Sequence, residues 1–195
     1  MPVLLALLMF QAPTPALEND YVRAWKDAAP CASAQAPGCS ERVIVALGNV
    51  QIPVGGSTRS LRRGEIAVFK AGESYGGPSG GPFYEVAFKA NHPPVETTPE
   101  QIPPAKNEII YDGADFFVFE EHLEVGDTRP RHTHSQRVVI QLNATKLQQW
   151  PDGQPEILRD IVPDGVAFNP PVIHTVKNVG ALPLRGIVLE LKPKR

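Results

Sequence analysis

The sequence predicts an all-β fold made of two similar halves. The 21 prolines and 16 glycines among the 195 residues divide the chain into many short segments, which suits strands and turns better than helices. No long stretch repeats its apolar residues at helical spacing. One strand-like stretch also occurs twice, because residues 40–47 match residues 135–142 position by position. An ordered match of this kind indicates an internal duplication.

The composition allows a globular protein and excludes some classes of partner. Hydrophobic residues make up 42% of the chain, enough to bury a core in one large domain or in two small ones. The net charge of -2, the pI near 6.2 and the lack of a Lys/Arg cluster argue against binding to nucleic acid or to an anionic membrane surface. We therefore expect a small-molecule ligand or substrate, and a homo-oligomer is compatible with the sequence.

The first residues are typical of a secretion signal. Residues 3–10 form an apolar run that is too short to span a bilayer, and Thr14 and Ala16 are suitable small residues before a cleavage point, although no Lys or Arg precedes the run. We predict a signal peptide at residues 1–16, no membrane span in the mature chain, and a secreted or periplasmic location. The alternative is a buried N-terminal strand in a cytoplasmic protein.

Cys31 and Cys39 are the two cysteines of the chain and lie eight positions apart. The segment between them looks flexible enough to fold back, so an exported protein would join them in a disulfide. In a cytoplasmic protein they would be two free thiols in a loop.

Each half contains an early strand and closes on an apolar one. The expected strands are 17–25, 40–47 and 83–88 in the first half, and 116–123, 135–142 and 184–191 in the second. Residues 91–106 are rich in proline, which disfavours regular strand pairing and predicts an extended linker. We therefore place two domains at residues 17–90 and 107–195.

The candidate site belongs to the second half. His132 and His134 open the repeated strand, where residues two apart point to the same face, and His174 follows a proline-rich turn. The match of residues 40–47 to 135–142 places Pro37 and Cys39 at the positions of His132 and His134, and a second match, of residues 69–75 to 168–174, places Tyr75 at the position of His174. The first half is therefore interpreted as a structural partner without metal ligands, and the second half as the one that carries the chemistry.

The second half resembles the cupin superfamily. Gly126, five residues and then His132-x-His134 are similar to the first motif of that family, and the proline-rich turn into His174, with Asn178 four residues later, resembles the second. With the degenerate first copy included, the chain resembles a bicupin. The resemblance implies a small antiparallel jelly-roll barrel in each half, with a metal held inside the second barrel.

The resemblance also implies the ligands, namely His132, His134 and His174. The family usually adds a glutamate four or five residues after the second histidine, and this chain has Val138 and Val139 there. The departure leaves a three-histidine site, as in the thiol dioxygenases that share this fold. Gln136 lies two residues after His134, so in a regular strand its side chain points to the same face as the histidines. It is expected to be a hydrogen-bond partner of the ligands or a weak fourth ligand, unless a bulge changes the face to which it points.

Three neutral imidazoles suit Fe(II), Zn, Mn, Ni or Cu and leave coordination positions open. The hypothesis favoured by the resemblance is a metal-binding cupin that uses Fe(II) as a dioxygenase on a small organic acid or thiol. The alternatives are a non-catalytic module that binds a small molecule or a metal, and a metal-dependent isomerase or lyase. No catalytic acid or base is assigned, because the facing of Glu120, Glu121 and Glu124 is not determined by their positions in the sequence.

Three other polar residues are expected to lie outside the chemistry. Asn178 is expected to cap a turn, and His122 to point to solvent from its strand. His92 precedes two prolines in the linker and receives no role.

Overall fold

The computed structural model describes residues 12–33, 39–91, 93 and 107–193. Several predictions concern residues outside these ranges: most of the signal peptide, Pro37, and most of the linker with His92. Every regular element of the described residues is a strand, and no helix there is long and apolar enough to cross a membrane.

The first half contains eight strands. They are β1 (Leu17–Glu18), β2 (Val22–Lys26), β3 (Arg42–Ala46), β4 (Val50–Val54), β5 (Ser57–Leu61), β6 (Ile66–Phe69), β7 (Ser79–Gly80) and β8 (Phe83–Phe88). The single opening strand expected over residues 17–25 is wrong, because the chain turns between β1 and β2. The side chain of Asn19 accepts hydrogen bonds from the backbone N–H groups of Tyr21 and Val22 at this turn.

The second half contains nine strands. They are β9 (Asn107–Asp112), β10 (Phe116–Leu123), β11 (Thr128–His134), β12 (Arg137–Gln141), β13 (Thr145–Pro151), β14 (Ile157–Ile161), β15 (Val166–Asn169), β16 (Val172–Asn178) and β17 (Leu184–Leu191). The predicted strands 116–123 and 184–191 agree with β10 and β17 at both ends.

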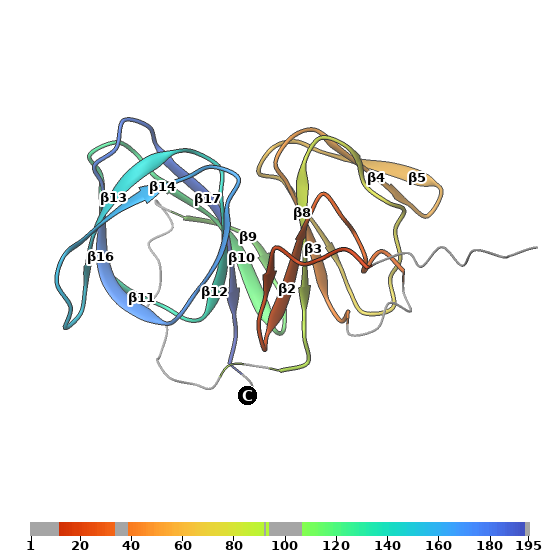
Figure 1. Cartoon of the computed structure of the whole chain (residues 1–195), viewed down its shortest axis with the longest axis horizontal. Coiled ribbons are helices and arrows are strands. Elements are labelled where there is room, and N and C mark those ends of the chain that lie inside the picture. The colour runs from red at the N-terminus through yellow and green to blue at the C-terminus, as the bar shows by residue number, and fades with distance from the viewer. Residues whose placement is uncertain (1–11, 34–38, 92, 94–106, 194–195) are drawn as a thin grey trace, which may run out of the picture.

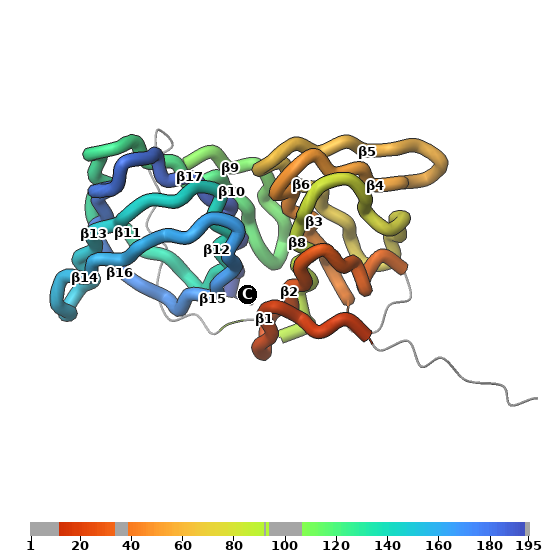
Figure 2. Tube along the Cα trace, turned by 45° about the horizontal axis from the view of Figure 1, so that its top comes forward, coloured from red at the N-terminus to blue at the C-terminus, as the bar shows by residue number. Residues whose placement is uncertain are grey.

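Each half folds into a barrel of two antiparallel sheets, as Figures 1 and 2 show. The first barrel has strand orders β1-β2-β8-β3-β6 and β5-β4-β7, and the second has β15-β12-β17-β10-β9 and β11-β16-β13-β14. The predicted all-β fold with two small antiparallel jelly-roll barrels is confirmed.

The strand ladders show which positions of the two halves correspond. Arg42 of β3 lies opposite Ala87 of β8, and Arg137 of β12 lies opposite Glu190 of β17, so the match of residues 40–47 to 135–142 agrees with the pairing. The alignment of the next segment is wrong by one residue. Phe168 pairs with Val138. The first-half equivalent of Val138 is Val43, which pairs with Val68. Phe168 therefore corresponds to Val68 and not to Phe69.

The two five-stranded sheets share one hydrophobic core between the barrels. Alternate residues of β3 and β12, such as Val43 and Val138, lie in this core, and Phe88 stacks on Phe116 with ring centroids 3.9 Å apart. At the edge of the contact, Arg63 forms an ion pair with Asp164 at 2.6 Å. Strands β3 and β12 are therefore buried on both faces, which explains why their sequences contain continuous apolar runs.

The shared core predicts that the two barrels unfold together. Phe116 is fully buried, so Phe116→Ala should lower the free energy of unfolding by about 3–5 kcal/mol through lost apolar burial and the cavity left behind. Trp25 and Trp150 report on the two halves, and their fluorescence should follow one denaturant transition. Val162→Ala, at an exposed position, is the control and should change stability by about 0.5 kcal/mol or less. Two separate transitions would contradict this expectation.

Candidate metal centre

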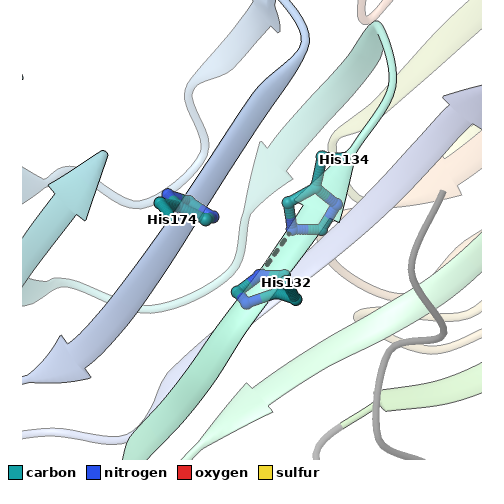
Figure 3. A group of neighbouring side chains, drawn as sticks. All are labelled: His132, His134 and His174. Carbon is teal, nitrogen blue, oxygen red and sulfur yellow. Dashed lines mark hydrogen bonds between the residues drawn. The ribbon is translucent and has the colours of Figure 1, made fainter. Parts of the chain in front are cut away.

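Three buried histidines meet inside the second barrel. His132 and His134 come from β11 and His174 from β16, and the antiparallel register sets His132 directly opposite His174. Their ring centroids lie 4.7 to 5.5 Å apart, and one nitrogen atom from each ring lies within 4.8 Å of the other two. Figure 3 shows the three rings gathered in the space between the two strands. The predicted grouping of these histidines is therefore present.

Hydrogen bonds set which nitrogen of each ring on β11 faces the centre. The Nδ1 atom of His132 lies 2.8 Å from the carbonyl oxygen of Pro130, which only accepts, so Nδ1 must carry the proton. The Nδ1 atom of His134 lies 2.8 Å from Oε2 of Glu190 and donates to it when Glu190 is a carboxylate. Both Nε2 atoms are then unprotonated electron-pair donors.

The unprotonated nitrogens need a shared partner. The Nε2 atoms of His132 and His134 are 3.0 Å apart, the contact that is dashed in Figure 3, and two lone pairs at this distance repel each other. Both ring nitrogens of His174 are buried, and neither has a hydrogen-bond partner in the part of the chain that the structure describes. Buried polar atoms are normally satisfied, so three imidazoles with donor atoms facing one another fit a bound cation. The residues present therefore fit the implied metal.

The histidines are held in the neutral form that binds metals. Burial lowers the pKa of His174 to about 2, with the neighbouring His132 and His134 contributing further. Burial also lowers the pKa of His132, and lowers that of His134 well below its usual value. No proton therefore competes for the imidazole lone pairs at neutral pH.

Glu190 is a functional residue that the sequence analysis missed. It lies on β17 and is 1% exposed, and besides His134 it accepts a hydrogen bond from the backbone N–H of Ser135 at 2.7 Å. Burial raises its pKa to about 7. A carboxylate that fixes the tautomer and orientation of a ligating histidine is a common supporting contact in metal sites. The available signal was a single acidic residue within the apolar closing strand.

A bulge in β11 places His132. The register of β11 against β16 shifts between Arg129 and His132. The guanidinium of Arg129 is fully buried at this point, where it donates to Glu121 on β10 at 2.7 Å and to Asn107 on β9 at 2.6 Å. Burial opposes ionisation of Glu121, but the nearby positive groups, with Arg129 the largest contributor among them, together outweigh it, so the pKa of Glu121 is lowered. The buried ion pair joins three strands next to the site.

The site opens into a small cavity with a volume of about 40 Å³ for water-sized occupants. This is room for about three water molecules. His134 and His174 line it, with five aliphatic residues, Val139, Leu147, Ile161, Val176 and Val188, and six polar ones, Glu121, Arg137, Gln141, Gln149, Arg159 and Asn169. The part of a ligand that lies in this enclosed space beside the histidines must therefore be small.

The prediction that the side chain of Gln136 points to the same face as the histidines is wrong. Strand β11 ends at His134 and β12 begins at Arg137, so the chain bends at residues 135–136. After the bend Val139 lines the cavity, while Val138 packs in the core between the barrels. Gln136 is not among the residues that line the cavity. The family's glutamate position thus faces the site, but an apolar side chain occupies it.

The remaining candidates divide between structural positions and the cavity. Asn178 is fully buried and caps a turn, as expected, accepting from the N–H of Gly180 at 3.0 Å. His122 points outward, as expected, and contacts Glu124 at 2.8 Å. Of the three glutamates left open by the sequence, Glu121 lines the cavity, whereas Glu120 pairs with Arg185 and Glu124 with His122.

The first barrel has a different set of buried polar contacts, and the one-residue correction of the alignment means that Tyr75 is not at the position of His174. Cys39, which aligns with His134, forms a disulfide with Cys31, with their Cα atoms 5.8 Å apart. Tyr75 donates its hydroxyl hydrogen bond to the buried Glu85, and the backbone N–H of Cys31 donates to the same carboxylate at 3.0 Å. Burial raises the pKa of Glu85. The disulfide expected for an exported protein is present in the structure.

Comparison with known proteins is informative only at the level of three-dimensional structure. No family model matches the sequence, and a search of curated proteins finds no match. Solved structures do match.

Three of these structures resemble most of the chain. A putative glyoxylate induced protein from Pseudomonas aeruginosa is 12% identical, with 90% of this chain and 76% of that chain covered and a TM-score of 0.63. AerE from Microcystis aeruginosa is 16% identical, covering 92% and 97%, with a TM-score of 0.57. A cupin 2 conserved barrel domain protein from Leptotrichia buccalis is 11% identical, covering 92% and 88%, with a TM-score of 0.55. At these identities the similarity establishes the fold, and the chain therefore has the cupin fold, with two barrels along one polypeptide.

Proposed function

We propose that the second barrel binds one divalent transition metal through His132, His134 and His174, with Fe(II) favoured and Zn, Mn, Ni or Cu also compatible. The observation that carries the proposal is the convergence of three buried imidazoles: the Nε2 atoms of His132 and His134 face each other, and the ring nitrogens of His174 have no hydrogen-bond partner among the described residues. Imidazole ligands suit all of these metals, and the histidines do not select among them.

The proposed activity is that of a non-heme metal-dependent oxygenase acting on a small organic acid or thiol. Three neutral ligands leave the full positive charge of the ion in place, and they leave positions at which a substrate and dioxygen would bind when the metal is present. Val139 and Val188 give the cavity an apolar side, and the small volume restricts the size of the substrate group that enters it.

The chain's own residues would orient and support this chemistry. Glu190 holds His134 with its Nε2 toward the site, and the carbonyl of Pro130 does the same for His132. Glu121 is the carboxylate that faces the cavity and is not hydrogen bonded to a histidine, but its ion pair with Arg129 keeps it ionised. It is therefore suited to electrostatic support more than to proton transfer near neutral pH.

Metal content and oxygen uptake test the two parts of the proposal separately. Metal-free protein loaded anaerobically with Fe(II) should retain about one ion per chain, and the triple variant His132→Ala/His134→Ala/His174→Ala should retain none. His122→Ala, which changes an exposed histidine, is the matched control and should load like the wild type. The loaded protein should then consume oxygen with at least one member of a panel of small carboxylates and thiols.

The outcomes also separate the alternatives. Metal uptake without turnover, with a ligand that raises the melting temperature and is recovered unchanged, would favour a non-catalytic binding module. Turnover without oxygen uptake would favour an isomerase or lyase. Equal metal content in the wild type and the triple variant would refute the metal site.

The contact between Glu190 and His134 predicts a supporting role in metal binding. Glu190→Gln keeps the size of the side chain but removes the carboxylate charge, present above the Glu190 pKa of about 7, that stabilises the Nδ1–H tautomer of His134. Metal affinity measured at about pH 8 should therefore fall by about 10- to 100-fold. Competition with a chelator measures the change. Gln136→Ala alters a nearby polar residue that does not line the cavity, and its metal affinity should equal that of the wild type. Unchanged affinity in Glu190→Gln would show that the contact does not orient the ligand.

We further propose that the protein is secreted or periplasmic. The Cys31–Cys39 disulfide supports this location, because such bonds persist in oxidising compartments and are rare in the cytosol. Thiol titration of the unfolded protein, isolated without reductant, should detect no free cysteine before reduction and both cysteines after it. Two free thiols in protein taken from its native compartment would argue for the cytoplasm.

A further inference from the structure

Arg159 lies at the edge of the cavity and has no partner among the described residues. It lies on β14, is solvent exposed and lines the same cavity as His134 and His174. It forms no hydrogen bond and no ion pair with any described residue. Each of the other described arginines makes at least one such contact, for example Arg131 with Asp152 and Arg185 with Glu120. The exception therefore lies at an exposed part of the cavity wall.

Two amide side chains accompany Arg159. Gln149 on β13 and Asn169 at the end of β15 line the same cavity, and neither side-chain amide is hydrogen bonded to a described residue. A guanidinium and two amides supply N–H donors that match the oxygen atoms of a carboxylate. The three residues come from three different strands, so their meeting in one cavity is a product of the fold.

The charges around the cavity favour an anion. Arg137 also lines the cavity. Burial lowers the pKa of Arg137, the charges of Glu190 and Glu121 raise it, and repulsion from Arg159 lowers it further. The two carboxylates have other partners, since Glu121 pairs with Arg129 and Glu190 contacts His134. A divalent ion at the histidines would add further positive charge. Binding of an anionic group beside Arg159 would relieve this excess.

The position of Arg159 implies a ligand with two functional groups. In the sheet order β11-β16-β13-β14, Arg159 is on the edge strand opposite to the one that carries His132 and His134. It pairs with Leu147 of β13, whereas His174 pairs with Pro151, four residues further along that strand. Four residues at about 3.4 Å each put the two backbone positions about 14 Å apart along the strands. Arg159 and the histidines therefore reach the cavity from different ends, and a ligand that contacts both needs a separate group for each.

We propose that Arg159, with the amides of Gln149 and Asn169, binds a terminal carboxylate of a short-chain organic acid whose other end carries a donor group for the metal. The inference rests on the proposed metal site and specifies the substrate class of that site. The acid is bifunctional, with a carboxylate at the outer end of the cavity and an oxygen or sulfur donor at the histidines.

Pairs of acids that differ by one carboxylate test this assignment. Malonate, succinate and glutarate are compared by titration calorimetry with propionate, butyrate and pentanoate, each diacid against the monoacid of equal chain length. Zinc-loaded protein is used, so that binding is measured without oxygen chemistry. At least one diacid should bind the wild type about tenfold more tightly than its monoacid, because the second carboxylate gains a charge-assisted contact.

The variants assign that preference to Arg159. Arg159→Gln should lose the diacid preference while keeping its zinc content and its affinity for the monoacid, and Arg159→Lys should retain part of the preference. The control is Lys146→Gln on β13, which removes the same charge from a residue paired with Asp160 at 3.2 Å and lying outside the cavity lining. It should behave like the wild type.

The possible failures are distinguishable. The inference would be overturned if the wild type showed no diacid preference, or if Arg159→Gln kept the full preference. It would also be overturned if Arg159→Gln and Lys146→Gln lost the preference equally. If the wild type takes up no zinc, the proposed metal site fails. In that case Arg159-dependent succinate binding by the metal-free protein would still support the carboxylate site, and its absence would overturn it.

Discussion

Burial of one sheet on both faces is the constraint on which the rest of the structure depends. The sheet β15-β12-β17-β10-β9 packs one face against the first barrel and uses the other as a wall of the second barrel. Because side chains alternate along a strand, Val138 and Ile140 enter the core between the barrels, and Arg137 and Val139 face the cavity. A slip of one residue would bury Arg137 between the barrels, so the shared core also fixes the composition of the site.

The site combines donors from one sheet with support from the other. The histidines lie on β11 and β16, while Glu190, which orients His134, projects from β17 of the opposite sheet. The bulge beside Arg129 brings His132 level with His174. A three-histidine centre in this fold therefore requires correct packing of both sheets, and the histidines in sequence are only part of it.

The two halves show how one duplicated framework can carry different interiors. Arg42 and Arg137 occupy equivalent ladder positions, and both donate to backbone carbonyls near the barrel rim. Beyond this shared arginine the interiors differ. The first barrel has Tyr75 against Glu85 and a disulfide, and the second has three imidazoles with a buried glutamate. Duplication preserved the strands that pack between the barrels and left the interior positions free to diverge.

The sequence alone determined the all-β class, the duplication and the three histidines, because each leaves a local mark: turn residues, a repeated strand and a spaced motif. The closing strands at residues 83–88 and 184–191 were predictable for the same reason. Only the tertiary structure decided what surrounds the histidines. The bend at residues 135–136 turns the side chain of Gln136 away from the face that carries the histidines. The strand pairing shows that Phe168 corresponds to Val68, one residue before the position that the sequence alignment gave. Glu190 and Arg159 are 56 and 25 positions from His134 and reach its cavity from separate strands, so their roles depend on strand order and register, which no local pattern encodes.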